Sequence, residues 1–224
     1  MPAQPRLVAE VAGIFVVDKP AGVRSDGSDQ AGVPDLPSWL DREQVAVPGT
    51  RPAHRLDLQA SGLVLCAADP KLRATIGEAL AQGAIEKTYL TLVHGRTRKK
   101  GTVRRPLQDG RRSRKVSATT RYRTIEVLGD LSLLAVRIET GRKHQIRRHL
   151  EGIGHPVVGD RRYRGRRRKP LPGAPDRLWL HARALVLPGG LVDAEEDVVL
   201  EAPLPPELID HLDALRGALV DSEE

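Results

Sequence analysis

The stretch HRLDLQASGLVLCAADP, residues 54–70, decides the fold. It places the acid Asp57 in a short polar loop, and the apolar run at 63–67 that follows predicts a buried strand. Asp69 suits a helix N-cap, Pro70 suits the first helical position, and Gly83 suits the end of the same helix. Asp57 is therefore expected on a loop that leads into a strand and a helix.

Segments on both sides of this stretch indicate an α+β protein with a largely antiparallel sheet. The turn Gly129-Asp130 separates two β-rich runs by two residues, which is typical of a hairpin. Strands are predicted at 14–17, 87–94, 119–128, 131–140 and 178–187, helices at 142–151 and 206–220, and a loop at 24–37. On the last helix, Leu208, Ile209, Leu212, Leu215 and Leu219 are expected to face inward.

The composition predicts one globular domain over residues 1–224, with a core at about 14–187 and an acidic segment at 191–224. A hydrophobic share of 40% is enough for a core. No apolar run approaches the length of a bilayer span, and Glu10 interrupts the apolar N-terminal stretch, so neither a membrane helix nor a signal peptide is expected. The lone Cys66 excludes an internal disulfide framework. A cytoplasmic monomer with no obligate protein partner is expected.

The formal net charge of +7 is unevenly distributed. Residues 96–115 carry ten Lys or Arg and one acid, residues 161–169 carry seven and none, and residues 191–224 carry eleven acids and one base. Basic clusters of this density favour a polyanion partner, although solvated loops of an arginine-rich protein would also explain them. Aromatic residues make up only 3% of the chain, so RNA or DNA would be held by its backbone and shape.

Several common chemistries lack their motifs. The chain has no Walker A sequence, and Ser61 lacks the preceding glycine of a nucleophile elbow. His144 and His149 are five residues apart, so on a helix they point in different directions and make a poor metal pair. No metal and no cofactor are therefore expected.

Asp57 has two explanations from the residues alone. It could be a turn residue paired with Arg55 for stability, or a carboxylate held for chemistry in a protein that binds a polyanion. Arg147 lies beside the apolar stripe of the helix predicted at 142–151, so it could point inward and keep a carboxylate ionised. A solvent-facing or phosphate-binding role would also explain Arg147, and Tyr89 could be a core residue of its strand.

Five motifs in order resemble the RluA family of RNA pseudouridine synthases. They are HRLDxxxSGL, KxYxxxVxG, TGRxHQIRxHL, GHPxxGDxxY and LHAxxL, with Lys19-Pro20-Ala21-Gly22 ahead of them. The resemblance spans roughly residues 14–187 and implies a bent, mostly antiparallel sheet with surrounding helices and a central cleft. The expected activity is isomerisation of uridines in rRNA or tRNA by a stand-alone catalytic domain, with no S4 RNA-binding module ahead of residue 14.

The resemblance also implies roles for individual residues. Asp57 matches the catalytic nucleophile, Tyr89 matches the tyrosine that stacks on uracil and takes the C2′ proton, and Arg147 matches the basic partner of the aspartate. Arg55 matches an arginine that fills the space left by the flipped base. The remaining substrate-binding candidates are His54, Leu180, Arg142, His144 and Gln145, and those for the RNA backbone are Lys99, Lys100, Arg166, Arg167 and Arg168. Ala60 departs from the usual threonine, and Thr91 departs from a common alanine.

Two other functions stay open at this point. A non-catalytic RNA-binding or chaperone protein would have the same fold and the same basic segments. A nuclease or glycosidase could use Asp57 hydrolytically, but the sequence lacks an acidic metal cluster, and a glycosidase usually needs two placed carboxylates. The sequence does not define the target uridine or the class of RNA.

Overall fold

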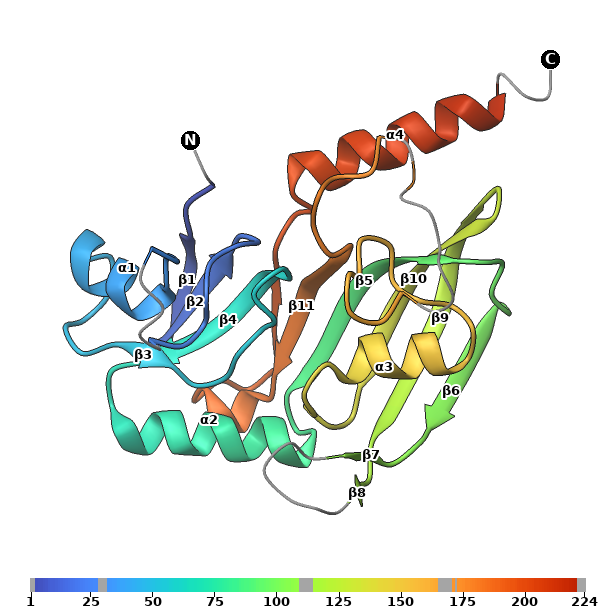
Figure 1. The fold of residues 1–224 in the computed structure, drawn as a ribbon. Helices are drawn as coiled ribbons and strands as arrows, with labels where there is room; N and C mark the ends of the chain where they lie inside the picture. The colour runs from blue at the N-terminus through green and yellow to red at the C-terminus, as the bar shows by residue number, and fades with distance from the viewer. Residues whose placement is uncertain (1–2, 28–31, 109–114, 165–170, 172, 221–224) are drawn as a thin grey trace. The chain divides into compact units, whose positions relative to one another are not determined.

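The computed structural model describes residues 3–27, 32–108, 115–164, 171 and 173–220 (Figure 1). Its elements confirm an α+β protein with a mostly antiparallel sheet. Two compact units are formed, the first by Met1–Lys87 with Ala182–Pro203 and the second by Thr88–His181 with Leu204–Glu224. In chain order the elements are β1 (Arg6–Val11), β2 (Ile14–Lys19), α1 (Leu36–Glu43), β3 (Arg51–Pro52), β4 (Ser61–Ala67), α2 (Pro70–Gln82), β5 (Glu86–His94), β6 (Lys100–Arg104), β7 (Leu107–Gln108), β8 (Lys115–Val116), β9 (Thr119–Leu128), β10 (Leu131–Ile138), α3 (Gln145–Gly152), β11 (Leu180–Leu187), η1 (Gly189–Leu191), β12 (Val198–Glu201) and α4 (Pro206–Val220).

The first unit is built around β4, whose seven residues are all buried. Its strand order is β1-β2-β4-β11, with β3 pairing with β4 and β12 with β11. The continuous apolar run of β4 reflects burial on both faces, and Ile76 and Leu80 of α2 join the same core. The ends of α2 are as predicted, because the Asp69 side chain accepts a hydrogen bond from the Lys71 N–H and Gly83 is left-handed, with φ of 78°.

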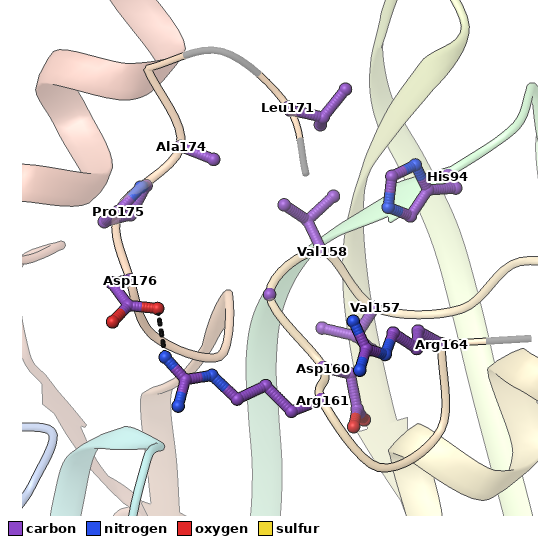
Figure 2. Close-up of a pocket in the computed structure, with 11 residues that line it drawn as sticks. His94, Val157, Val158, Asp160, Arg161, Arg164, Leu171, Ala174, Pro175 and Asp176 are labelled. Carbon is purple, nitrogen blue, oxygen red and sulfur yellow. Dashed lines mark hydrogen bonds and ion pairs between the residues drawn. The ribbon is translucent and has the colours of Figure 1, made fainter. Parts of the chain in front are cut away.

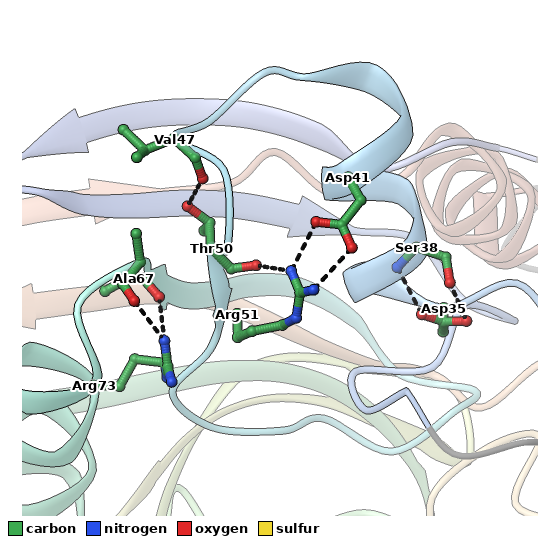
Figure 3. A network of polar contacts seen from close by, with 9 residues as sticks. Asp35, Ser38, Asp41, Val47, Thr50, Arg51, Ala67 and Arg73 are labelled. Carbon is green, nitrogen blue, oxygen red and sulfur yellow. Dashed lines mark hydrogen bonds and ion pairs between the residues drawn. The ribbon is translucent and has the colours of Figure 1, made fainter.

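A polar network fixes the entry to β4 (Figure 3). Asp35 accepts a hydrogen bond from the Ser38 N–H at 2.8 Å and so caps α1, which begins inside the segment predicted as the loop 24–37. The guanidinium of Arg51 on β3 donates to both oxygens of Asp41 on α1, at 2.8 and 2.9 Å. The predicted loop was therefore too long, since a cap and a first-turn proline were present in its last residues.

The second unit contains the predicted hairpin, with β9 and β10 joined at Gly129-Asp130. Its strand order is β5-β10-β9-β6, and all of these neighbours pair antiparallel. The helix predicted at 142–151 was placed too early, because α3 begins at Gln145. His144 before it is left-handed, with φ of 54°, and the Arg142 N–H donates to the Gln145 side chain instead of entering the helix.

The terminal helix α4 confirms the helix predicted at 206–220 and corrects its inner face. Leu208 and Leu212 are buried as expected, whereas Ile209 is 42% exposed and His211 is buried in its place. Ion pairs hold both ends of the helix, since Glu207 binds Arg177 at 2.6 Å and Arg216 binds Glu126 at 2.7 Å. No helix in the described ranges is long and apolar enough to cross a membrane.

Candidate active site

Asp57 lies in a tight turn of the first unit, between β3 and β4. The Ala60 N–H donates to the Asp57 carbonyl oxygen at 3.0 Å, which closes the turn. The preceding Leu56 is buried, and its N–H donates to the Ser25 hydroxyl at 3.0 Å, while that hydroxyl donates to the Leu56 carbonyl at 3.4 Å. The backbone on both sides of Asp57 is therefore fixed.

A buried lysine connects this turn to the KPAG segment. Lys19 is fully buried, and its ammonium group donates to the carbonyls of Pro20, Val23 and Ala60 at 2.9, 2.8 and 2.7 Å. Charge-assisted bonds to a buried cation are strong, and leaving that cation unsatisfied would be costly. Two motifs that are far apart in the sequence are thereby held to each other.

Arg55 does not pair with Asp57 in the described structure. Its exposed guanidinium binds Asp26, with 2.7 Å between Nη1 and Oδ2. Arg55 is therefore not the partner that a stabilising role of Asp57 would need, and the choice between a structural and a chemical role for Asp57 stays a prediction. The predicted role of Arg55 in filling the space left by a flipped base stays a prediction.

His54 anchors β4 by its ring. Its Nε2 accepts a hydrogen bond from the Leu65 N–H at 3.0 Å, which requires this nitrogen to be unprotonated. Burial, and then the nearby charge of Lys87, lowers the pKa of His54 to about 4. His54 therefore has a structural contact, and its predicted part in substrate binding stays a prediction.

The low pKa of His54 predicts an acid-sensitive fold. The unfolded chain takes up a proton near pH 6.5 and the folded chain only near pH 4, so stability is highest above pH 6.5 and falls as the pH drops through this window. His54→Gln keeps an acceptor but does not titrate. The free energy of unfolding, measured with denaturant, should fall between pH 7 and pH 4.5 by about 2 kcal/mol more in the wild type than in this variant. An equal loss in both proteins would contradict the assignment.

In the second unit, Arg147 of α3 forms a buried ion pair with Asp160. Its Nε donates to Oδ2 at 2.7 Å and its Nη2 to Oδ1 at 2.9 Å, and the two side chains are 11% and 0% exposed. Oδ1 also accepts the N–H groups of Arg162 and Tyr163. Although burial acts in the opposite direction, the hydrogen bonds and charge of Arg147 keep the pKa of Asp160 below its usual value.

Asp160 was missed as a functional candidate, although it stands in the quoted GHPxxGDxxY motif. Tyr163, three residues later, was missed as well. Its hydroxyl is 3.0 Å from Nδ1 of His144, and the guanidinium of Arg147 lies 5.1 Å from its ring centroid. The predicted residues His144 and Arg147 are thus brought together around Tyr163. The sequence signal that could have identified Asp160 and Tyr163 was the presence of polar residues in a motif rich in Gly and Pro.

Gln145 organises the TGRKHQ loop from inside. Its side-chain oxygen accepts from the Thr140 hydroxyl at 2.7 Å and from the Arg142 N–H at 3.1 Å. Its amide nitrogen donates to the Thr119 carbonyl at 2.9 Å and to the Thr120 hydroxyl at 3.2 Å. Gln145 is 3% exposed, so these bonds hold the loop against β9. Its predicted contact with substrate stays a prediction.

The other predicted residues lie on several elements. Tyr89 lies on β5, 8% exposed and opposite Val136 of β10, and Leu180 begins β11 and is also buried. Arg142, Lys99 and Lys100 are exposed. Arg166, Arg167 and Arg168 lie outside the described residues. Among the residues that are described, no group of three or more His, Cys, Asp or Glu side chains could hold a metal ion.

A pocket of about 290 Å³ lies beside the Arg147–Asp160 pair in the second unit (Figure 2). Val157, Val158 and Pro175 form part of its apolar wall, and Figure 2 shows Arg161 reaching across to Asp176. Asp160 lines the pocket, although its carboxylate is fully buried by its partners. The pocket therefore offers apolar surface beside the GHPxxGDxxY motif. Both carboxylates that line it, those of Asp160 and Asp176, are already paired with arginines.

Gly159 allows the chain to turn beneath this pocket. It is left-handed, with φ of 75°, and a Cβ atom there would lie 1.9 Å from the Arg177 carbonyl oxygen. Gly159→Ala is expected to destabilise the protein by about 3 kcal/mol, because strain adds to a backbone clash. Gly154→Ala, at φ of 87° with open space around it, should cost only about 1 kcal/mol. Urea unfolding of the two variants tests this, and equal losses would count against the clash.

Exposed cations gathered on β6 and β9 indicate a protein that binds a polyanion. A family model described as RNA pseudouridylate synthase matches residues 13–152. The chain belongs to this family.

Individual relatives agree with this assignment. An uncharacterized RNA pseudouridine synthase of Chloroflexus aurantiacus is 40% identical over 69% of this chain and 50% of its own length. The ribosomal large subunit pseudouridine synthase D of Yersinia pestis is 32% identical over 97% of this chain and 72% of its own. The solved structure of human RNA pseudouridylate synthase domain containing 4 matches with a TM-score of 0.76 and 26% identity, over 94% of this chain and 92% of that one. The chain spans 50% to 65% of the length of the first curated relatives.

Proposed function

We propose that this protein isomerises specific uridines of structured RNA to pseudouridine, with Asp57 as the nucleophile. Membership of the RNA pseudouridylate synthase family, which extends across the Asp57 turn and α3, is the observation on which the proposal rests. The relative from Yersinia pestis, named as a ribosomal large subunit enzyme, favours rRNA as the substrate, with tRNA as the alternative.

The reaction defines what the residues must do. The N1–C1′ bond breaks, the uracil rotates, and a C5–C1′ bond forms, after which C5 releases its hydrogen as a proton and N1 gains one. The base cannot be reached inside a stacked helix, so it must be flipped out. In this proposal, the Asp57 carboxylate attacks C1′ as the N1–C1′ bond breaks, and the Asp57–C1′ bond breaks again before product forms. The ring of Tyr89 stacks on the uracil, and its oxygen takes the C2′ proton as Asp57 leaves and returns it to C2′ when the C5–C1′ bond forms.

Arg147 and Arg55 have supporting roles in the same proposal. Arg147 is the basic partner that keeps the nucleophile ionised, and Arg55 occupies the space left by the flipped base. Leu180 lines the uracil pocket, while Arg142, His144, Gln145 and His54 complete substrate binding. Backbone phosphates are contacted by five cations, which are Lys99, Lys100, Arg166, Arg167 and Arg168. We further propose that residues 1–224 act as one catalytic domain, in a cytoplasmic monomer without an obligate protein partner.

Tritium release from transcripts labelled at C5 of uridine tests the proposal. Purified protein is incubated with rRNA and with tRNA transcripts, and tritium is expected in the solvent because C5 gives up its hydrogen when it joins C1′. Mapping of pseudouridine in cellular RNA, with and without the gene, then identifies the target. RNA binding without release from any transcript, together with an unchanged map, would support the non-catalytic alternative instead.

A further inference from the structure

One face of the sheet in the second unit carries several cations that lie outside the five sequence motifs. Along β9, Thr120 and Tyr122 are buried, and Thr120 bonds to His149 of α3, whereas Arg121 and Arg123 between them are exposed. Since strand side chains alternate, these arginines point away from α3. Residues that pair across strands share a face, and the pairing therefore defines a β9 basic face of Lys100, Arg104, Arg121, Arg123 and Arg137.

The register of this face places like charges directly opposite each other. Lys100 of β6 pairs with Arg123 of β9, and Arg121 of β9 pairs with Arg137 of β10. Like charges in directly opposed positions destabilise a sheet. Glu139 offsets part of this repulsion, with 2.6 Å between its carboxylate and Nε of Arg121. The arrangement therefore costs folding free energy, which an anion on this face would recover.

Three cations of the face are available to such an anion. Within the described ranges, Lys100, Arg104 and Arg123 are exposed and have no acidic side chain in ion-pair contact. Lys100 and Arg104 are four residues apart on β6 and so lie about 13 Å from each other. This distance is comparable with two successive phosphate intervals of an RNA backbone, and Arg123 lies directly opposite Lys100. The face has no exposed aromatic ring, so it offers contacts to phosphates and none for base stacking.

The face is also remote from the residues predicted to react. Tyr89 pairs with Val136, which pairs with Tyr122, so all three point to the face opposite the cations. β6 is the last strand in the sheet order. An RNA bound at Tyr89 would therefore have to pass around β6 to reach the β9 basic face, which requires a long, structured substrate.

We propose that the β9 basic face binds the phosphate backbone of such an RNA, away from the uridine that is isomerised. This inference rests on the proposed function, and it adds a second area of contact that a short stem-loop cannot reach. The competing explanation is that cations on an edge strand prevent pairing with another sheet. That explanation predicts self-association when the charges are removed, and no change in RNA binding.

The double variant Lys100→Gln/Arg123→Gln tests the proposal. For a long structured rRNA transcript, we expect the slope of log K against log salt to decrease in size by about 2, since each lost phosphate contact removes about 0.9. We expect about tenfold weaker binding of this transcript, and a smaller loss for a short stem-loop, which can reach at most the phosphate contact proposed above for Lys100. The free energy of unfolding should be unchanged or higher, because the two side chains repel each other.

The control removes the same net charge elsewhere. Arg42→Gln/Lys71→Gln neutralises two exposed cations on α1 and α2 of the first unit, and its slope should stay at the wild-type value. An unchanged slope in the test variant, or an equal decrease in both variants, would overturn the proposal, as would self-association in light scattering with normal RNA binding. Should the double variant fail to fold, Arg104→Gln alone is expected to decrease the slope by about 1.

Binding and isomerisation are measured separately in this design. If no transcript loses tritium but the slope still falls only in the test variant, the proposed function fails and the RNA-binding face stands. If tritium is released and the slope does not respond, the proposed function stands and the face does not.

Discussion

Asp57→Asn is expected to abolish pseudouridine formation while leaving RNA binding intact. The amide cannot attack the sugar, so tritium release should fall by at least about a thousandfold. RNA affinity should be equal or slightly higher, because a negative charge is removed from the vicinity of phosphates. The fold should tolerate the change, since the turn is closed by the backbone of Asp57 and Ala60 and by Lys19.

Asp41→Asn is the matched control for that variant. Asp41 is an exposed carboxylate of the same unit, bound to Arg51 on the surface (Figure 3). An exposed ion pair contributes at most about 1 kcal/mol, so activity and stability should both stay close to wild type. Isomerisation that persists in Asp57→Asn would exclude this residue as the nucleophile, whereas equal loss in both variants would indicate a folding defect.

Asp160→Asn is expected to produce a large loss of stability. It removes the charge opposite Arg147 while preserving the shape of the side chain, and Arg147 is only 11% exposed. Breaking a buried pair from one side leaves an uncompensated charge, which costs about 3 kcal/mol. Isomerisation should fall as well, at temperatures where the variant is still folded, because the guanidinium of Arg147 loses the group that orients it.

A chemically identical change at the surface isolates the effect of burial. Arg161 and Asp176 form an ion pair whose side chains are 77% and 87% exposed. Asp176→Asn should therefore change the free energy of unfolding by less than about 1 kcal/mol. Thermal and urea unfolding of both variants decide the matter, and comparable losses would show that the buried pair has no special structural importance.

The sequence predicted the elements whose signals are local. The ends of α2 were predicted from Asp69, Pro70 and Gly83 because caps act through bonds within one turn. The β9–β10 hairpin was predicted from Gly129-Asp130 for the same reason. α3 began later than predicted, because the buried side chain of Gln145 bonds the loop to β9, a contact between segments far apart in the chain.

The candidate site also has a part that the sequence predicted and a part that only the structure revealed. Ordered motifs identified the Asp57 turn, Tyr89 and α3, because a family retains residue types at related spacings. They did not reveal that Lys19 holds the Asp57 turn through Ala60, or that Asp160 binds Arg147. Such partners depend on which backbone groups meet after folding, and hydrophobic periodicity carries no information about them.

The amino-acid sequence by itself determined the α+β class, the family resemblance and the presence of concentrated positive charge. Tertiary structure alone decided that Arg55 binds Asp26, that His54 is a neutral anchor, and that Arg121 and Arg123 share a face with Lys100. Local backbone preferences and motif order are written along the chain. Burial, strand register and the choice of charge partner arise only when distant segments pack together, because each depends on the surroundings that folding creates.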